Sequence, residues 1–241
     1  MRLSILSIDT SSQVSSVAVL SEECVAAELS MQGALTHSET LMPHIETVLH
    51  MARIKKEELE GIAVSIGPGS FTGLRIGLAA AKMMSYALCI PLIGVPTLEA
   101  LAHHCICEGV RLVCMMDAQK GSAYVQEFTW RADGDALKLQ EDRPLVILPL
   151  TEVVAALKGT ARPVVLLGDA MQKHMDAALP EDVHLAPIHA RMPRAACVGL
   201  AGLARLRRGE SDDPMTAVPL YLRRSEAEVL WEKRHGSEAA S

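Results

Sequence analysis

Aromatic residues, disulfide-type cysteine patterns and unbroken apolar runs are all scarce in this chain of 241 residues. Phe, Trp and Tyr together make up 3% of the sequence, yet 49% of the residues are hydrophobic and 22% are charged. These proportions exclude a disordered or fibrous protein and indicate a globular one with one large or two compact domains. The six cysteines lack the spacing of a disulfide framework and lie mostly inside apolar runs, which predicts buried thiols and a reducing compartment.

No long apolar segment suggests a membrane span or a secretory signal. The most apolar stretch, residues 76–95, contains Lys82 and Pro91 and therefore predicts a helix followed by a strand, rather than a span of about 20 apolar residues. Residues 1–20 are interrupted by polar side chains, among them Asp9, and lack the continuous apolar core of a signal peptide. We therefore expect a cytoplasmic protein that needs no membrane.

Positive charge is also in deficit. The chain has 23 Lys and Arg residues against 29 Asp and Glu residues, which gives a formal net charge of −6 at pH 7. A net negative charge opposes unaided binding to a polyanion such as tRNA or an acidic membrane surface. Any role on nucleic acid would therefore have to pass through a complex with other proteins.

The two halves of the chain begin with the same pattern of apolar strand, aspartate, small polar turn and second strand. The aspartates are Asp9 and Asp117, 108 positions apart. This self-similarity predicts a duplicated α/β fold with an N-terminal lobe over residues 1–109 and a C-terminal lobe over residues 110–241 that ends in a docked tail. The expected strands cover residues 3–8, 16–20, 24–29, 61–66, 91–95, 111–116, 123–130, 137–140, 145–148 and 163–168, and the expected helices cover 38–52, 71–88, 97–107, 151–157, 169–178 and 194–208.

The two aspartate turns are candidate nucleotide-binding turns. An aspartate at a strand end can hold hydrated Mg²⁺ while nearby hydroxyl and backbone N–H groups face a phosphate, and two facing turns then form a nucleotide cleft. Asp9 with Thr10, and Asp117, fit that plan. The alternative is that each aspartate only completes its turn as an Asx motif.

The least generic segment of the sequence is the glycine-rich run over residues 65–77. It lacks the Gly-Lys-Ser/Thr ending of a phosphate-binding P-loop, and Thr72 stands where a dinucleotide motif would need its third glycine. Gly67 and Gly69 are expected to bend a strand tightly into a helix N-terminus. Further along, a flat strip serves either packing inside the chain or close docking of a partner; it is formed by Gly73, Gly77, Ala80 and Ala81.

A surface for self-association is expected on the first two helices. The first of them carries apolar residues spread too widely around the helix to be absorbed by a single sheet face, and the second carries the glycine strip. Two copies would then form a four-helix contact. The residues assigned to this partner surface are Leu41, Met42, Ile45, Val48, Leu49, Gly73, Ile76, Gly77, Ala80 and Met84.

Residues for metal binding or catalysis do not form a recognisable set. Among the nine histidines, His103 and His104 lack the i, i+4 spacing that places two imidazoles on one helix face, and Cys105 and Cys107 are too close for a C-x₂-C metal clip. No Ser-His-Asp or Cys-His set stands out. We therefore expect no metal, no cofactor and no catalytic residue in this chain.

Four motifs resemble those of the TsaB (YeaZ) family, nearly from end to end. They are Ile-Asp-Thr-Ser at 8–11, Gly-Pro-Gly-Ser-Phe-Thr-Gly-Leu-Arg at 67–75, Gly-Val-Pro-Thr-Leu-Glu-Ala-Leu-Ala at 94–102 and Pro-Leu-Tyr-Leu-Arg at 219–223. The resemblance implies a bacterial cytoplasmic protein with the duplicated actin-like ATPase fold. It further implies a noncatalytic dimerisation subunit that forms homodimers alone, pairs with the TsaD paralogue and works with the ATPase TsaE. Together these make N6-threonylcarbamoyladenosine at position 37 of ANN-decoding tRNAs, so tRNA would be met through the complex only.

The same resemblance bears on catalysis. TsaD carries a metal-binding His-x-x-x-His motif, and this chain has Thr97 and Leu101 at the two ligand positions. The family pattern also leads us to expect an Arg after the Asp-Ala pair at 117–118, where this chain has Gln119. Two enzymatic alternatives belong to another class: an actin-like phosphotransferase using Asp9 and Asp117, or a glycoprotease-like metallopeptidase.

Overall fold

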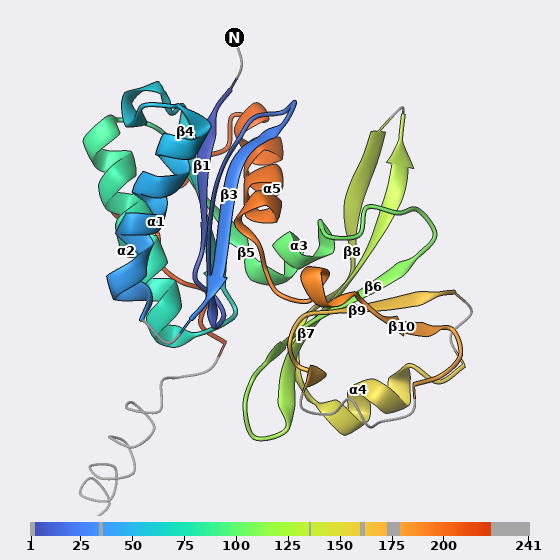
Figure 1. The fold of residues 1–241 in the computed structure, drawn as a ribbon. Coiled ribbons are helices and arrows are strands. Elements are labelled where there is room, and N and C mark those ends of the chain that lie inside the picture. Colours follow the sequence, from blue (N-terminus) through green and yellow to red (C-terminus); the bar gives the residue numbers. More distant parts are fainter. Residues whose placement is uncertain (1–2, 34–35, 135, 160–161, 173–178, 223–241) are drawn as a thin grey trace, which may run out of the picture.

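The computed structural model describes residues 3–33, 36–134, 136–159, 162–172 and 179–222, which form two lobes, each built on a five-stranded sheet (Figure 1). The strands of the first sheet are β1 (Ile5–Asp9), β2 (Val14–Leu20), β3 (Val25–Gln32), β4 (Gly61–Gly67) and β5 (Leu92–Pro96). Those of the second are β6 (Arg111–Asp117), β7 (Ser122–Asp133), β8 (Ala136–Pro149), β9 (Val164–Leu167) and β10 (Val183–Leu185).

Both sheets have the same topology. The order is β3-β2-β1-β4-β5 in the first and β8-β7-β6-β9-β10 in the second. In each sheet the first three strands of the lobe form an antiparallel meander, and the last two add in parallel to the first. The central strand β1 is buried at every position, as expected for a strand covered on both faces. The duplicated α/β fold predicted from the repeated aspartate pattern is therefore confirmed.

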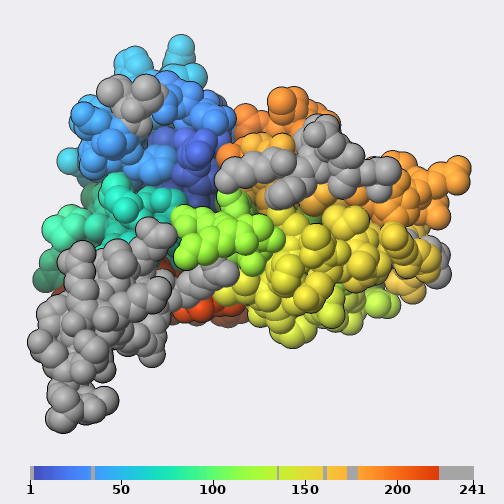
Figure 2. Space-filling model, turned by 90° about the horizontal axis from the view of Figure 1, so that it is seen from below, coloured from blue at the N-terminus to red at the C-terminus, as the bar shows by residue number. Residues whose placement is uncertain are grey.

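The helices cover both faces of each sheet (Figure 1). The first sheet has α1 and α2 on one face and α5 on the other, and the second has α4 on one face and α3 on the other. Figure 2 shows the two lobes side by side, with the blue and teal residues in one and the yellow residues of β8 and α4 in the other. The helices are α1 (His37–Ala52), α2 (Phe71–Leu88), α3 (Thr97–Ala102), α4 (Leu150–Ala156) and α5 (Ala195–Arg207), with 3₁₀ turns at Lys56–Glu58 and Ile188–Ala190.

The chain crosses back to the first lobe near its C-terminal end. Helix α5, which the sequence assigned to the C-terminal half, packs against the first sheet, where Val198 and Ala201 join a core cluster with Ile5. Its N-terminal amides are capped by first-lobe side chains: Ser16 Oγ accepts from the Ala195 N–H at 2.9 Å. The expected division at residue 109/110 separates the two sheets, but α5 lies with the first of them.

Several element boundaries differ from those expected. Residues 137–140 and 145–148 belong to one strand, β8, which is at the sheet edge and so tolerates Pro144 beside a shift of register. Strand β10 was not predicted because only three residues form it. Helix α3 ends at Ala102, five residues earlier than expected. The helix expected over 169–178 lies partly outside the described residues.

Within the described ranges, no helix is both long enough and apolar enough to cross a membrane.

Candidate functional site

The first aspartate turn is closed and internally bonded. Asp9 is completely buried, and its carboxylate accepts hydrogen bonds from the Ser11 N–H at 3.1 Å, from the Ser11 hydroxyl at 3.0 Å and from the Ser65 hydroxyl. Burial raises the pKa of Asp9, and the hydrogen bonds from Ser65 and Ser11 oppose that shift. Asp9 therefore completes an Asx-type turn and also ties β1 to β4. The contribution of Ser65 had no local sequence signal, because 56 positions separate it from Asp9.

Helix α2 fills the space in front of this turn. The Thr10 hydroxyl donates to the Gly73 carbonyl oxygen at 2.8 Å, and the Ser70 N–H donates to the Ser11 carbonyl oxygen at 2.7 Å. A Cβ atom at Gly69 would lie 2.2 Å from the Ser11 carbonyl oxygen, and one at Gly73 would lie 2.0 Å from that of Thr10. The glycines are thus required for the close approach of α2 to the turn.

The glycine strip does not face a partner. A Cβ atom at Gly77 would lie 2.2 Å from the Thr10 hydroxyl oxygen, so Gly77, like Gly73, is buried against the chain's own turn. The prediction that these two glycines open room for a partner is therefore wrong. The reason is tertiary: the small face of α2 packs on the β1–β2 turn, from which it is separated by more than 60 positions.

Two histidines of α1 close the turn from the other side. The Nε2 atom of His37 lies 2.8 Å from the Ser12 carbonyl oxygen and donates to it, while Nδ1 of His44 is 3.1 Å from the Ser15 hydroxyl. Burial lowers the pKa of His44, and the nearby His37 adds to the effect. Residues 9–12 have at most 6% of their surface exposed, so in this conformation the turn presents no open donor group to a phosphate.

The second aspartate turn has a different structure. The Gln119 N–H donates to Asp117 Oδ1 at 2.8 Å, and the Asp117 N–H donates to Asp169 Oδ1 at the same distance. Gln119 and Lys120 have positive φ values of 63° and 55°, followed by Gly121 at 76°. Both residues are exposed, so this turn is open where the first is closed. A nucleotide role for Asp9, Thr10, Gly67, Gly69 and Asp117 stays a prediction.

The two positions aligned with the TsaD metal ligands do not suit a metal. Thr97 and Leu101 are both fully buried on α3, and leucine has no donor atom. Thr97 is the first helical residue and follows the N-cap Pro96, and its hydroxyl has no hydrogen-bond partner within the described part of the chain. The described residues contain no group of three His, Cys, Asp or Glu side chains placed to hold a metal ion.

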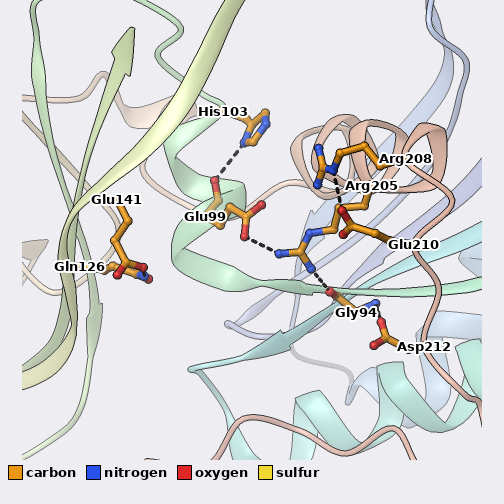
Figure 3. Close-up of polar contacts among 9 residues, drawn as sticks. All are labelled: Gly94, Glu99, His103, Gln126, Glu141, Arg205, Arg208, Glu210 and Asp212. Atoms are coloured by element: carbon orange, nitrogen blue, oxygen red, sulfur yellow. Dashed lines mark hydrogen bonds and ion pairs between the residues drawn. The ribbon is translucent and has the colours of Figure 1, made fainter.

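Helix α3 is fixed to the first lobe by polar contacts (Figure 3). Arg205 of α5 donates to Glu99 at 2.8 Å and to the Gly94 carbonyl oxygen at 2.6 Å, while Asp212 accepts from the Gly94 N–H at 2.6 Å. Burial raises the pKa of Glu99, and Arg205 opposes the shift. These contacts stabilise the connection between β5 and α3 at the seam of the lobes.

The C-terminal end of α3 contacts the second lobe. Trp130 of β7 donates from its indole N–H to the Ala102 carbonyl oxygen at 3.2 Å, and its ring meets His103 edge-on at 5.1 Å. The next residue, His104, has a buried Nε2 atom with no partner within the described part of the chain. Burial, together with the positive charge of Arg194, lowers the pKa of His104 to about 4. His103 and His104, whose spacing did not suit a metal site, are therefore part of the interlobe seam.

The ten residues of the expected partner surface divide by burial. Leu41, Ile45 and Val48 are at most 2% exposed and pack on the first sheet, so the sheet absorbs more of the α1 stripe than expected. Gly73 and Gly77 are buried against the turn. The five that are partly or fully exposed are Met42, Leu49, Ile76, Ala80 and Met84.

Sequence reasoning missed two of the most exposed apolar residues on this face. Met83 and Tyr86 of α2 each have 68% of their surface exposed, and Met42 of α1 has 48%. The helical period of α2 contains the signal, since Ile76, Ala80, Met83 and Met84 lie on neighbouring turns. The outward surface of α1 and α2, called here the α1–α2 face, thus exposes the large apolar side chains of Met42, Met83 and Tyr86 among smaller and polar residues.

Two sheets of identical strand order, each flanked by helices, define the duplicated actin-like fold. Residues 32–231 match the family model described as TsaD: tRNA N6-adenosine threonylcarbamoyltransferase. A solved structure described as YeaZ from Pseudomonas aeruginosa superimposes with a TM-score of 0.74 at 25% identity, covering 91% of this chain and all of that one.

Curated relatives narrow the assignment. A protein of Bacillus subtilis, named tRNA threonylcarbamoyladenosine biosynthesis protein TsaB, is 30% identical over 95% of this chain and 98% of its own length. Its namesake in Escherichia coli K12 is 26% identical over 97% and 99%. The chain belongs to the TsaB (YeaZ) family, which confirms the resemblance noted in its motifs.

Proposed function

We propose that this chain is a noncatalytic scaffold subunit in the synthesis of N6-threonylcarbamoyladenosine at position 37 of ANN-decoding tRNAs. In this role it forms homodimers alone and, when a TsaD paralogue is present, binds and activates it, with the ATPase TsaE as a further partner. The observation that carries the proposal is the similarity to TsaB proteins over nearly the full length of both chains. The net charge of −6 supports contact with tRNA through the complex only.

The α1–α2 face is the proposed contact surface for both the second copy and the paralogue. Met42, Met83 and Tyr86 expose large apolar surfaces on neighbouring helices, and methionine and aromatic residues are enriched at protein interfaces. In an aromatic-poor chain, an exposed tyrosine on a helix supports a binding role more strongly than it would elsewhere. A paralogue with the same fold would present the equivalent helices.

The absence of a catalytic role is supported by how the candidate residues are used. The Asp9 carboxylate accepts bonds from Ser11 and Ser65, which leaves it poorly placed to hold hydrated Mg²⁺ for a phosphotransferase. Thr97 and Leu101 lack the imidazole pair that a metallopeptidase of this superfamily would need. Among the residues that the structure describes, no other group supports either enzymatic alternative.

The test is reconstitution of tRNA modification from unmodified tRNA, threonylcarbamoyl adenylate and ATP, with the TsaD and TsaE proteins of the same organism. We expect no modified adenosine with this chain alone, little with TsaD and TsaE, and full modification when all are combined. Mass spectrometry of tRNA nucleosides measures the product. Modification by this chain without TsaD, or equal modification with and without it, would contradict the scaffold role.

The contact surface is tested separately by charge substitution. Met83→Asp should weaken both the homodimer and TsaD pairing, because a carboxylate would be buried at the centre of an apolar contact. Ile188→Asp is the matched control, since Ile188 is 79% exposed but lies in a 3₁₀ turn far along the chain from α2. Sedimentation velocity at several concentrations compares the two. Equal association of both variants would place the interface elsewhere.

A further inference from the structure

The two least generic motifs of the sequence meet in space. Phe71, in the glycine-rich motif, lies with its ring centroid 4.8 Å from that of Tyr221 in the C-terminal motif. Arg75 donates from Nε to the Tyr221 hydroxyl at 2.8 Å, and its guanidinium carbon lies 3.8 Å from the Phe71 ring centroid. Three side chains from segments 146 positions apart therefore form one stack.

Backbone contacts join the same segments on the other side of the glycine-rich loop, residues 67–70. The Leu220 N–H donates to the Ile66 carbonyl oxygen at 2.7 Å. Gly67 has a φ of +116°, and a Cβ atom there would lie 2.9 Å from the Leu220 carbonyl oxygen. The C-terminal segment therefore contacts the residues on both sides of the loop, Ile66 before the loop and Phe71 after it.

The earlier part of the C-terminal segment, from Asp212 to Ala217, is also hydrogen-bonded to the first lobe. Asp212 pairs with β5, where its N–H donates to the Leu92 carbonyl oxygen at 2.8 Å. Lys82 of α2 then donates to the Ala217 carbonyl oxygen at 2.9 Å. Residues 212–222 consequently run from the edge of the first sheet along α2 to the loop.

The loop at residues 67–70 also covers the first aspartate turn. Ser70 follows Gly67 by three residues, and its N–H donates to Ser11 inside the buried turn. The C-terminal segment, the loop and the turn are therefore connected in series. Solvent can reach the stack of Tyr221 and Arg75, since Tyr221 is 40% exposed and Arg75 is exposed. Ser11, in the turn at the other end of this chain of contacts, is only 1% exposed.

We propose that residues 212–222 are a latch that holds the loop against the turn, and that release of the Tyr221 stack opens the turn to solvent. The latch is a conformational device built from surface contacts, so a partner protein can reach it without unfolding the lobe. It explains why two motifs 146 positions apart carry aromatic and arginine residues that contact each other. The proposal is independent of the partner surface on the α1–α2 face.

Hydrogen exchange measured by mass spectrometry on the full chain tests the latch. Tyr221→Ala should make amide exchange about tenfold faster in peptides covering residues 9–14 and 67–74, because local opening exposes the Ser11 and Ser70 amides. Exchange in β7 of the second lobe should not change. Tyr221→Phe keeps the ring contact with Phe71 and should retain most of the protection.

The matched control is Met215→Ala in the same segment, since Met215 is 74% exposed. It should leave exchange at the turn as in the parent. The latch is refuted if Tyr221→Ala loosens residues 212–222 while the turn stays protected. It is equally refuted if exchange rises to the same extent in both lobes, since that outcome indicates general loss of stability rather than local opening.

Discussion

The Thr10 hydroxyl donates a hydrogen bond to the Gly73 carbonyl oxygen across 63 positions of sequence, at a distance of 2.8 Å. This bond places the small face of α2 directly on the β1–β2 turn. It also explains why the glycines of α2 belong to the interior of the first lobe rather than to a partner surface.

Gly77→Ala should destabilise the fold, although alanine is the better helix former. The new Cβ atom would lie 2.2 Å from the Thr10 hydroxyl oxygen, and overpacking of this kind costs about 1–3 kcal/mol. In a Thr10→Ala background the nearest atom is the residue 10 Cβ at 3.5 Å, an ordinary contact. The same Gly77→Ala change should then be neutral or stabilising.

Urea unfolding of the parent, the two single variants and the double variant completes this cycle. We expect the double variant to have a higher free energy of unfolding than the sum of the two single effects predicts. Additive effects of the two substitutions would show that Thr10 and Gly77 do not interact in the folded protein. Gly77→Leu would likewise report on folding rather than on a partner interface.

Replacing Asp9 separates hydrogen bonding from charge. Asp9→Asn keeps an acceptor for the Ser11 N–H and removes a buried carboxylate whose pKa burial raises, so it should change stability little. Asp9→Ala leaves that N–H unpaired in a buried turn and should cost about 1–3 kcal/mol. Thermal unfolding ranks the variants. A fully stable Asp9→Asn protein that binds TsaD but supports no tRNA modification would assign Asp9 a chemical role.

Acid should weaken the folded state through His104. Its pKa falls from 6.5 to about 4 on folding, so between pH 4 and pH 6.5 His104 is protonated in the unfolded chain and neutral in the folded one. Stability is therefore present above pH 6.5 and is lost as the pH drops towards 4, by up to about 3 kcal/mol. His104→Gln removes this titration. Urea midpoints from pH 7.5 to 4.5 should fall less steeply in the variant; parallel curves would exclude His104 as the source.

Metal removal should have no effect on the isolated chain. Thr97 and Leu101 replace a histidine pair, and we expect neither stoichiometric zinc or iron nor specific ATP hydrolysis. Elemental analysis before and after dialysis against EDTA, with the unfolding temperature as a second readout, checks this. One bound metal per chain, or a fall in unfolding temperature on chelation, would contradict it.

Local sequence pattern was enough for most of the elements and for their duplication. The apolar run that ends at Asp9 and its counterpart that ends at Asp117 have strand composition and turn chemistry that act over a few residues, and such short-range preferences can be seen without a structure. The boundaries of α2 at Phe71 and Leu88 were predicted for the same reason. The C-terminal motif was also expected to dock.

Only the tertiary structure decided what those elements face. Gly77 contacts Thr10, Ser65 binds Asp9, and α5 returns to the first sheet, each through contacts between residues more than 50 positions apart. A small-residue strip has the same sequence pattern whether it packs on a partner or on the chain's own turn. Which of the two surfaces packs on the strip depends on which one the fold places against it. That placement is set by the whole topology rather than by any local spacing.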